Sequence, residues 1–190
     1  VIRYLKKIDE ISHRLDQSIK DILAYSKNKR TDLKYELIEP ESLAQKLFEN
    51  AKYFSKREIQ LQIVKKGSTA FISDYMRVTS LLGNLISNSI KYSCDREVPS
   101  FIKFTYTVDE NEGVFEIEDN GIGIPEEKQT RIFEMFYRAN SETSGSGLGL
   151  YICAEIVKKL GGLITVRSQP GKGSTFIVTL PNNKLLPGEE

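Results

Sequence analysis

NLISNSIKY, residues 84–92, is the end of a segment whose apolar residues recur at helical spacing. The period predicts a helix over 75–92, capped by Asp74, with a buried stripe made of Leu81, Leu82, Leu85, Ile86 and Ile90. Asn84, Asn88 and either Lys91 or Tyr92 share one face of this helix. Buried amides are costly unless they have partners, and an amide oxygen is a hard donor that suits Mg²⁺. An ordinary amphipathic helix with two polar residues is the alternative that this stretch leaves open.

Around this helix, strand and helix patterns alternate irregularly. Apolar residues at helical spacing predict helices over 40–54 and 148–160. Period-two patterns predict strands over 34–38, 59–63, 70–73, 101–108, 114–118, 163–168 and 174–180. The segments 101–108 and 114–118 flank the turn ENEG and predict an antiparallel hairpin. We therefore expect an α+β fold, a two-layer sandwich in which a mixed β-sheet packs on helices.

A long N-terminal helix is expected before this domain, over residues 2–29. Its inward positions alternate three and four residues apart, as in a coiled coil: Leu5, Ile8, Ser12, Leu15, Ile19, Ile22 and Ser26. A single helix with such a seam needs a partner helix, and a second copy of the chain is the natural source. His13, the only histidine, falls at an outward position of this register and is interpreted as a solvated helix residue.

Composition excludes several classes of protein. The chain has 27 Lys and Arg against 26 Asp and Glu, so it lacks the charge of a basic-groove nucleic-acid binder. Cys94 and Cys153 form no CxxC pair, which favours a reducing, cytoplasmic compartment over a disulfide framework or a zinc site. No apolar run is long enough to span a bilayer, so we expect no membrane contact by this chain. Anchoring of a parent protein in the inner membrane is left open.

Two glycine-containing loops flank an aromatic segment. DNGIGIP, 119–125, places Asp119 at the end of an expected strand, where its carboxylate could accept a hydrogen bond from the amine of adenine. SGSGLGL, 144–150, opens a helix, and the backbone N–H groups of such a turn suit phosphate. Between them, FEMFYR, 133–138, brings Arg138 within reach of a phosphate. A plain turn, a flexible linker and a hydrophobic cluster with a solvated arginine are the respective alternatives.

The joint order of these motifs is more specific than any one of them. NLISNSIKY, DNGIGIP, IFEMFYR, GSGLGLYI and PGKGSTF together resemble the N, G1, F and G2 boxes in the ATP-binding domain of bacterial sensor histidine kinases. The resemblance covers 35–181 and implies the Bergerat-type ATP-binding fold of that family, with ATP and Mg²⁺ as cofactors. The wider superfamily includes type II topoisomerase, mismatch-repair and chaperone ATPases.

The resemblance also implies roles for matching residues on the phosphate side of the nucleotide. Asn88 would hold Mg²⁺, with Asn84 close to the same site. Lys91 would contact phosphates and Arg138 would approach the γ-phosphate, so Asn88, Lys91 and Arg138 are the implied catalytic residues. The segment RAN, 138–140, replaces the acidic ending expected after the F box, and the lid looks short.

Further residues are implied to line the nucleoside and the phosphates. Asp119 would read the adenine amine, and Tyr92 would lie against the nucleoside. The remaining implied lining residues are Gly121, Gly123, Ile124, Gly145, Ser146, Gly147, Leu148, Gly149 and, through water, Thr175.

The implied activity is transfer of the γ-phosphoryl group to a histidine, for relay to an aspartate on a response-regulator receiver domain. Superfamily members that hydrolyse ATP carry a glutamate base one helical turn before the magnesium asparagine. Asn84 stands at that position, and an amide cannot accept the proton of an attacking water. Two alternatives are a slow ATP hydrolase and a non-enzymatic dimerisation or sensing module with a vestigial nucleotide site.

The location of the acceptor histidine follows from the same comparison. In the family, an acid follows the acceptor directly and a proline follows it five residues later, but His13 precedes Arg14 and position 18 is Ser18. The N-terminal segment therefore resembles the second helix of the dimerisation hairpin, and the acceptor is expected outside this chain. The implied domains are a partial dimerisation hairpin over 1–32, a catalytic domain over 33–183 and a tail over 184–190, with homodimerisation through the first segment.

Overall fold

A computed structural model describes residues 11–12, 15–16, 19, 21–23, 25–53, 55, 57–67, 70–94, 99–139 and 146–184. Its main sheet has the strand order β2-β4-β5-β7-β6, in which β2 and β4 are parallel and the other neighbours antiparallel. These strands are β2 (Ile59–Lys66), β4 (Ser100–Val108), β5 (Glu112–Asp119), β6 (Leu163–Gln169) and β7 (Gly173–Pro181). The predicted mixed sheet and the α+β class are confirmed.

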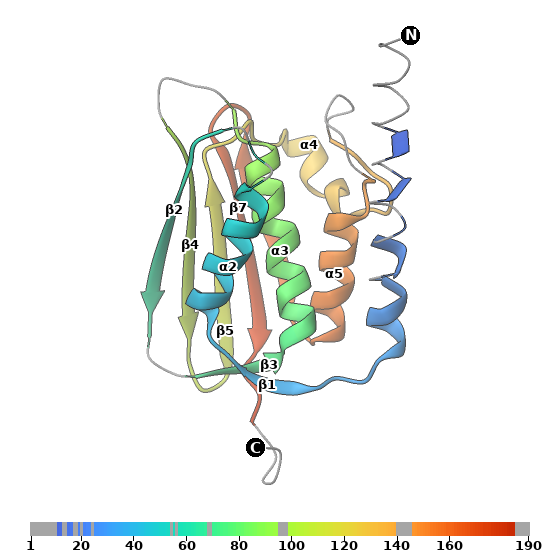
Figure 1. Ribbon diagram of the computed structural model, residues 1–190, viewed down its shortest axis with the longest axis vertical. Coiled ribbons are helices and arrows are strands. Elements are labelled where there is room, and N and C mark those ends of the chain that lie inside the picture. The colour runs from blue at the N-terminus through green and yellow to red at the C-terminus, as the bar shows by residue number, and fades with distance from the viewer. Residues whose placement is uncertain are drawn as a thin grey trace.

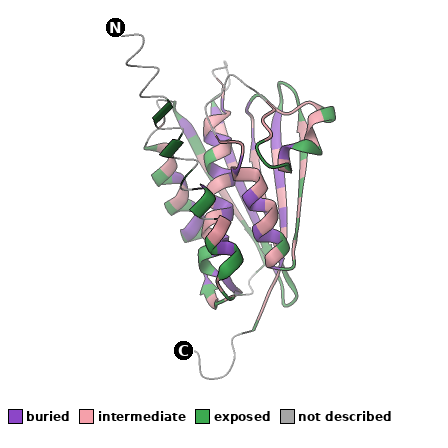
Figure 2. Cartoon of the chain, turned by 90° about the vertical axis from the view of Figure 1, so that its right-hand side faces the viewer, coloured by how far each residue is buried: buried purple, intermediate pink, exposed green. Residues whose placement is uncertain are grey.

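Helices cover one face of this sheet, and a small second sheet closes one end of the helical layer (Figure 1). The second sheet pairs β1 (Tyr35–Ile38) antiparallel with β3 (Phe71–Asp74). The helices are α2 (Pro40–Lys52), α3 (Tyr75–Lys91), the single turn α4 (Glu126–Gln129) and α5 (Gly149–Lys159), with a 3₁₀ turn, η1, over Arg131–Phe133. Buried residues gather between the helices and the sheet (Figure 2).

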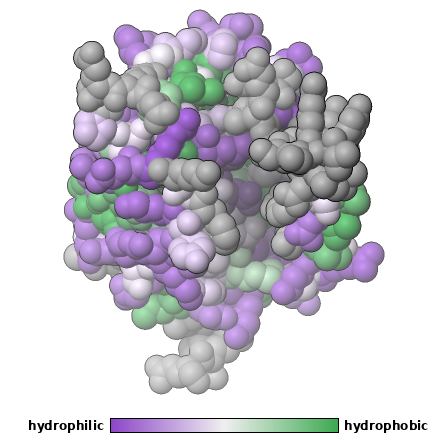
Figure 3. All heavy atoms as spheres, turned by 45° about the horizontal axis from the view of Figure 1, so that its top comes forward, coloured by the Kyte–Doolittle hydropathy of each residue, from purple (hydrophilic) through white to green (hydrophobic). Residues whose placement is uncertain are grey.

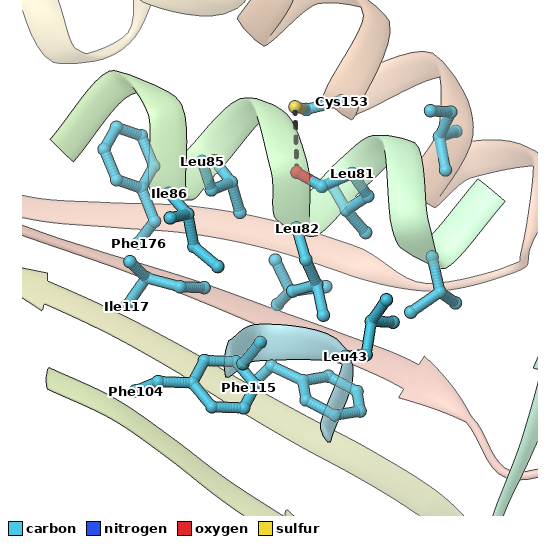
Figure 4. Close-up of a cluster of buried hydrophobic side chains, with 14 of the residues drawn as sticks. Leu43, Leu81, Leu82, Leu85, Ile86, Phe104, Phe115, Ile117, Cys153 and Phe176 are labelled. Atoms are coloured by element: carbon cyan, nitrogen blue, oxygen red, sulfur yellow. Dashed lines mark hydrogen bonds between the residues drawn. The ribbon is translucent and has the colours of Figure 1, made fainter. Parts of the chain in front are cut away.

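The central helix α3 forms where its apolar period predicts it. Asp74 ends β3 and caps α3, because its carboxylate accepts a hydrogen bond of 2.9 Å from the Arg77 backbone N–H. The predicted core stripe is buried in full: Leu81, Leu82, Leu85, Ile86 and Ile90. These side chains meet the aromatic and aliphatic residues of β4, β5 and β7 (Figure 4). The core therefore holds α3 over the middle of the sheet.

The N-terminal helix requires a correction in length. The helix described there is short, ten residues rather than the long helix predicted over 2–29. Nine of its residues are described, at 21–23 and 25–30. Before them, the described residues 11, 12, 15, 16 and 19 also have helical backbone. Leu15, Ile19 and Ile22 of the predicted seam are exposed, and their pairing with a partner helix stays a prediction. Leu5, Ile8 and His13 lie outside the described residues.

Candidate functional site

The C-terminal half of α3, the loop after β5 and the start of α5 meet at one end of the molecule, the upper end in Figure 1. The Ile122 N–H donates to the Tyr92 carbonyl at 3.1 Å, which joins the loop to α3. The Asn84 side-chain oxygen lies 3.0 Å from where a Cβ on Gly149 would stand, which joins α3 to α5. Figure 3 brings this end forward and shows a mostly hydrophilic surface with small hydrophobic patches.

Asp119 is the buried acid of this region, with 8% of its surface exposed. One carboxylate oxygen accepts from the backbone N–H of Gly121 at 2.8 Å and of Ser174 at 3.3 Å. The other oxygen accepts from the Ser89 hydroxyl at 3.2 Å. Burial raises the pKa of Asp119 above its ordinary value, and these three hydrogen bonds oppose the rise. The carboxylate is thus held in one orientation by donors from α3, the following loop and β7.

The loop DNGIGIP is held tightly between α3 and the β6–β7 turn. A Cβ on Gly121 would stand 2.6 Å from the Tyr92 carbonyl oxygen, so only glycine allows this approach. Gly123 has φ +71°, and a Cβ there would lie 2.0 Å from the Gln169 carbonyl oxygen. The Ile124 N–H donates to a serine hydroxyl of β6, Ser168 Oγ, at 2.8 Å, and the Ile124 side chain packs against the core. The glycines therefore shape the opening beside Asp119.

The polar face of α3 lies beside this loop. The Asn84 amide nitrogen donates to the Ser80 carbonyl at 2.9 Å, which leaves its oxygen on the side of Gly149. Asn88 is half-buried one turn further on, and within the described part of the chain no side-chain hydrogen bond engages it. The Lys91 ammonium lies 4.8 Å from the centre of the Tyr92 ring. The structure thus brings all four predicted residues of NLISNSIKY to the same end of the fold.

The glycine-rich loop enters α5 beside this face. Ser146 Oγ accepts from the Leu148 N–H at 3.2 Å, and Leu148 is buried in the core just before α5 begins at Gly149. Gly147 has φ +77°, and a Cβ there would stand 2.8 Å from the Phe136 backbone. Gly145 lies outside the described residues. Close backbone packing therefore fixes the second half of the loop.

Arg138 follows η1 and is half-buried. Its neighbours are fixed: the Lys128 ammonium donates to the Ala139 carbonyl at 2.9 Å, and the Arg131 guanidinium lies 4.5 Å from the centre of the Tyr137 ring. The approach of Arg138 to a γ-phosphate stays a prediction.

Thr175 lies apart from Asp119. In the sheet register Asp119 faces Ser174, whereas Thr175 faces Glu118 on the opposite side of the sheet. The sequence interpretation missed Ser174 and Ser89, which hold the carboxylate. Ser89 directly follows Asn88 in the predicted helix. Ser174 directly precedes Thr175 in PGKGSTF, and the register of that strand is the signal that could have identified Ser174.

Clusters of metal-ligating side chains and membrane-spanning helices are both absent from the described residues. These residues contain no group of three or more His, Cys, Asp or Glu side chains that could hold a metal ion. No helix in the described ranges has the length and apolar character to cross a bilayer.

The chain is similar in sequence to known proteins. The sequence profile described as "Histidine kinase-, DNA gyrase B-, and HSP90-like ATPase" matches residues 73–184. The chain is 38% identical over 115 residues to the aerobic respiration control sensor protein ArcB of Escherichia coli (strain K12), covering 57% of this chain and 14% of ArcB. It is 32% identical over 182 residues to the methanogenesis regulatory histidine kinase FilI of Methanothrix harundinacea (strain 6Ac), covering 93% of this chain and 20% of FilI.

A solved structure extends the likeness to three dimensions. The histidine kinase AdeS of Acinetobacter baumannii superposes with a TM-score of 0.69 at 26% identity, covering 95% of this chain and 82% of that chain. The chain spans 20% or less of ArcB and of FilI, so it corresponds to one part of those longer proteins. From the profile match and the geometry of the site, the chain belongs to the histidine kinase-, DNA gyrase B- and HSP90-like ATPase family, as the ATP-binding domain found in sensor histidine kinases.

Proposed function

We propose that this chain is the catalytic part of a two-component sensor histidine kinase, which binds Mg-ATP and transfers the γ-phosphoryl group to a histidine outside this chain. The observation that carries the proposal is the convergence of Asp119, the asparagines of α3 and the glycine loop at one end of the fold. A response-regulator aspartate would receive the group next. Residues 1–32 would supply the second dimerisation helix, 33–183 the catalytic domain and 184–190 a tail, in a homodimer in the cytoplasm.

Adenine recognition would rest on the remaining acceptor capacity of Asp119. An ionised carboxylate has about four lone-pair sites, and Gly121, Ser89 and Ser174 donate to Asp119. One site is left for an exocyclic amine, while a carbonyl at the same place would face an acceptor. The acid would therefore select adenine over guanine.

The phosphate side of the site would use hard oxygen donors and positive charge. The donor set fits Mg²⁺, because Asn88 presents an amide without a partner among the described side chains and the Asn84 oxygen faces α5. Asn88 would be the protein ligand, with Asn84 close to the ion. Mg²⁺ supplies charge neutralisation for phosphoryl transfer when it is bound. Lys91 and Arg138 would add positive charge around the phosphates, and the N–H groups of 145–149 would orient them.

The residue one turn before Asn88 favours transfer over hydrolysis. The Asn84 amide nitrogen donates one hydrogen bond to the Ser80 carbonyl, and its amide oxygen lies on the side of Gly149. Such a group cannot take a proton from water, whereas a neutral imidazole attacks through its own lone pair. The site would therefore leave water poorly activated and serve an incoming histidine. The similarity to FilI, a methanogenesis regulatory histidine kinase, supports this proposal.

Nucleotide binding is tested first by isothermal titration calorimetry with Mg-ATP and Mg-GTP. We expect wild type to prefer Mg-ATP, and Asp119→Asn to lose about tenfold or more in affinity, which corresponds to the loss of one charged hydrogen bond. Glu118→Gln is the matched control, because Glu118 is the neighbouring acid on the opposite side of the sheet. Equal losses in the two variants, or no ATP binding by wild type, would contradict the proposed recognition.

Phosphoryl transfer is tested by intact mass spectrometry at neutral pH. Wild type and His13→Ala are incubated with Mg-ATP, and free phosphate is measured in the same samples. ATP binding with no phosphate on either protein supports a donor whose acceptor lies elsewhere. Phosphate on wild type alone would place the acceptor at His13 and overturn that part of the proposal. Steady phosphate release without an acceptor would indicate a hydrolase.

A further inference from the structure

The N-terminal helix has an unusual distribution of polar and apolar residues. Asp21 and Asn28 are buried, with 9% and 5% of their surfaces exposed, and half-buried Tyr25 lies between them. Their spacing of four and three residues places them on one face of the helix. The apolar residues Ile22 and Leu23 are exposed. The helix therefore contacts its own domain through polar side chains, whereas a surface helix normally buries its apolar face.

One of these polar contacts reaches the predicted phosphate loop. The Ser146 hydroxyl donates a hydrogen bond to the Asp21 carboxylate, across 125 positions of sequence. One turn further along the helix, the Tyr151 hydroxyl of α5 donates to the Tyr25 hydroxyl at 3.4 Å, and the ring centres are 5.6 Å apart. The helix thus lies along α5 and ends its contact at the loop that leads into α5.

The other end of the helix is anchored more firmly. The buried Arg77 guanidinium donates to the Asn28 side-chain oxygen at 2.8 Å and to the Thr31 carbonyl at 2.7 Å. The Lys159 ammonium at the end of α5 donates to the carbonyls of Lys29 and Thr31 at 3.2 and 2.9 Å. The helix is thus held firmly at 28–31, whereas Tyr25 and Asp21 each contribute a separate polar contact. The part of the helix around Asp21 can therefore separate from α5 while the part at 28–31 stays bound to the domain.

We propose that the N-terminal helix is a reversible latch on the phosphate loop, in which Asp21 holds Ser146 and lowers the affinity for ATP. The inference rests on the proposed function, because it takes Ser146 as a residue that meets phosphate. While the Ser146 hydroxyl donates its hydrogen bond to Asp21, it cannot donate to a phosphate oxygen. The Asp21 carboxylate also repels the phosphates that would replace it.

The size of this effect follows from Coulomb's law. Two groups that share one hydroxyl partner lie about 6 Å apart, and the effective dielectric constant is about 20 for a pair near a protein surface and about 80 in bulk water. The repulsion between one carboxylate and one phosphate charge then corresponds to a loss in affinity of about threefold to a hundredfold. When the helix separates from α5, its polar side chains exchange hydrogen bonds with the protein for hydrogen bonds with water. The net free-energy cost of this exchange is modest. Because Ile22 and Leu23 stay exposed on the free side of the helix, the latch is compatible with pairing of two copies.

The inference is tested by calorimetry and hydrogen exchange on the whole chain. We expect Asp21→Asn to bind Mg-ATP at least about threefold, and up to about a hundredfold, more tightly than wild type. Asp16→Asn, the same change at an exposed position of the same segment, should bind as wild type. Without nucleotide, the backbone amides of 21–30 should exchange faster in Asp21→Ala than in wild type. In wild type, the same amides should exchange faster after Mg-ATP is added, because coupling between two sites is reciprocal.

Several results would overturn the latch. Unchanged or weaker ATP binding by Asp21→Asn would remove its inhibitory role, and unchanged exchange over 21–30 in Asp21→Ala would show that Asp21 does not hold the helix. ATP binding by Asp21→Asn but not by wild type would support the latch. No ATP binding by either protein would refute both the proposed function and the inhibitory role, while the exchange of Asp21→Ala would still decide whether the contact holds the helix.

Discussion

Replacement of Arg77 by methionine should destabilise the whole domain, because this residue has only 1% of its surface exposed. Its guanidinium forms an ion pair with Asp74, which has 3% exposure, and donates to the Asn28 and Thr31 carbonyls. Asp74 in turn caps α3 and accepts from the Lys34 N–H at 3.1 Å. The ion pair thus joins the N-terminal helix, the strand β1 and the central helix.

The magnitude follows from what Arg77→Met leaves behind. Methionine fills much of the volume, so the loss of packing is small, but the Asp74 carboxylate stays buried without its counter-charge. Removal of one partner from a buried ion pair costs about 3–5 kcal/mol. The Thr31 carbonyl is only part-buried and can bind water instead, whereas the buried Asn28 carbonyl loses its donor and adds to the cost. We therefore expect the free energy of unfolding to fall by about 3–5 kcal/mol.

Urea denaturation followed by far-ultraviolet circular dichroism measures this loss. Arg131→Met is the matched control, because Arg131 pairs with Glu134 on the surface at 3.4 Å and should change stability by less than about 1 kcal/mol. The double variant Arg77→Met/Asp74→Asn should recover part of the loss, since asparagine still caps a helix and carries no charge. A loss below about 1 kcal/mol in Arg77→Met would refute the reasoning that the ion pair holds these elements together.

Three other changes test the site. The pKa of Asp119 is higher in the native state than in the unfolded chain, so the native state binds the carboxyl proton more tightly. The stability that this proton contributes is therefore lost as the pH rises through the native pKa. Asp119→Asn should therefore gain stability relative to wild type between about pH 4 and pH 7 in urea denaturation, and parallel profiles would contradict the burial argument. Gly123→Ala should lose about 2 kcal/mol or more, because it adds a clash at 2.0 Å to the cost of φ +71°; Gly171→Ala, with φ +76° and open space around its Cβ, should lose only about 1 kcal/mol. Asn88→Ala should abolish the Mg²⁺ dependence of ATP affinity in calorimetry with and without the metal, and an affinity that still responds to Mg²⁺ would exclude Asn88 as its ligand.

The parts of the fold that follow from the spacing of apolar residues along the chain could be predicted from the sequence. The stripe from Leu81 to Ile90 recurs at helical spacing, and all of it is buried under α3 as expected. The position of Asp119 at the end of a strand was likewise readable, since DNGIGIP follows an alternating segment and β5 ends at Asp119. Periodicity succeeded at these residues because each side chain's environment is decided by its neighbours along the chain.

Contacts distant in sequence could not be predicted in this way. Thr175 and Ser174 are both polar, and only the pairing of β7 with β5 decides which of them faces Asp119. The burial of Asp21 against Ser146 depends on where the N-terminal helix meets α5, which its own period does not indicate. Leu15 and Ile19 of that period are exposed, and the period gave no sign that another face of the helix packs on the domain.

The burial of Asp119 is best explained by binding, because it works against stability. Desolvation disfavours its charge, and Gly121, Ser89 and Ser174 return part of that cost by donating to the carboxylate. The backbone donors reach it only because glycines flank it: a Cβ on Gly173 would stand 1.9 Å from the Asp119 carbonyl oxygen, and one on Gly121 would stand 2.8 Å from its carboxylate. A hydrophobic residue at 119 would need none of these arrangements. A carboxylate kept buried, oriented and short of one hydrogen bond is instead suited to an amine that arrives with a ligand.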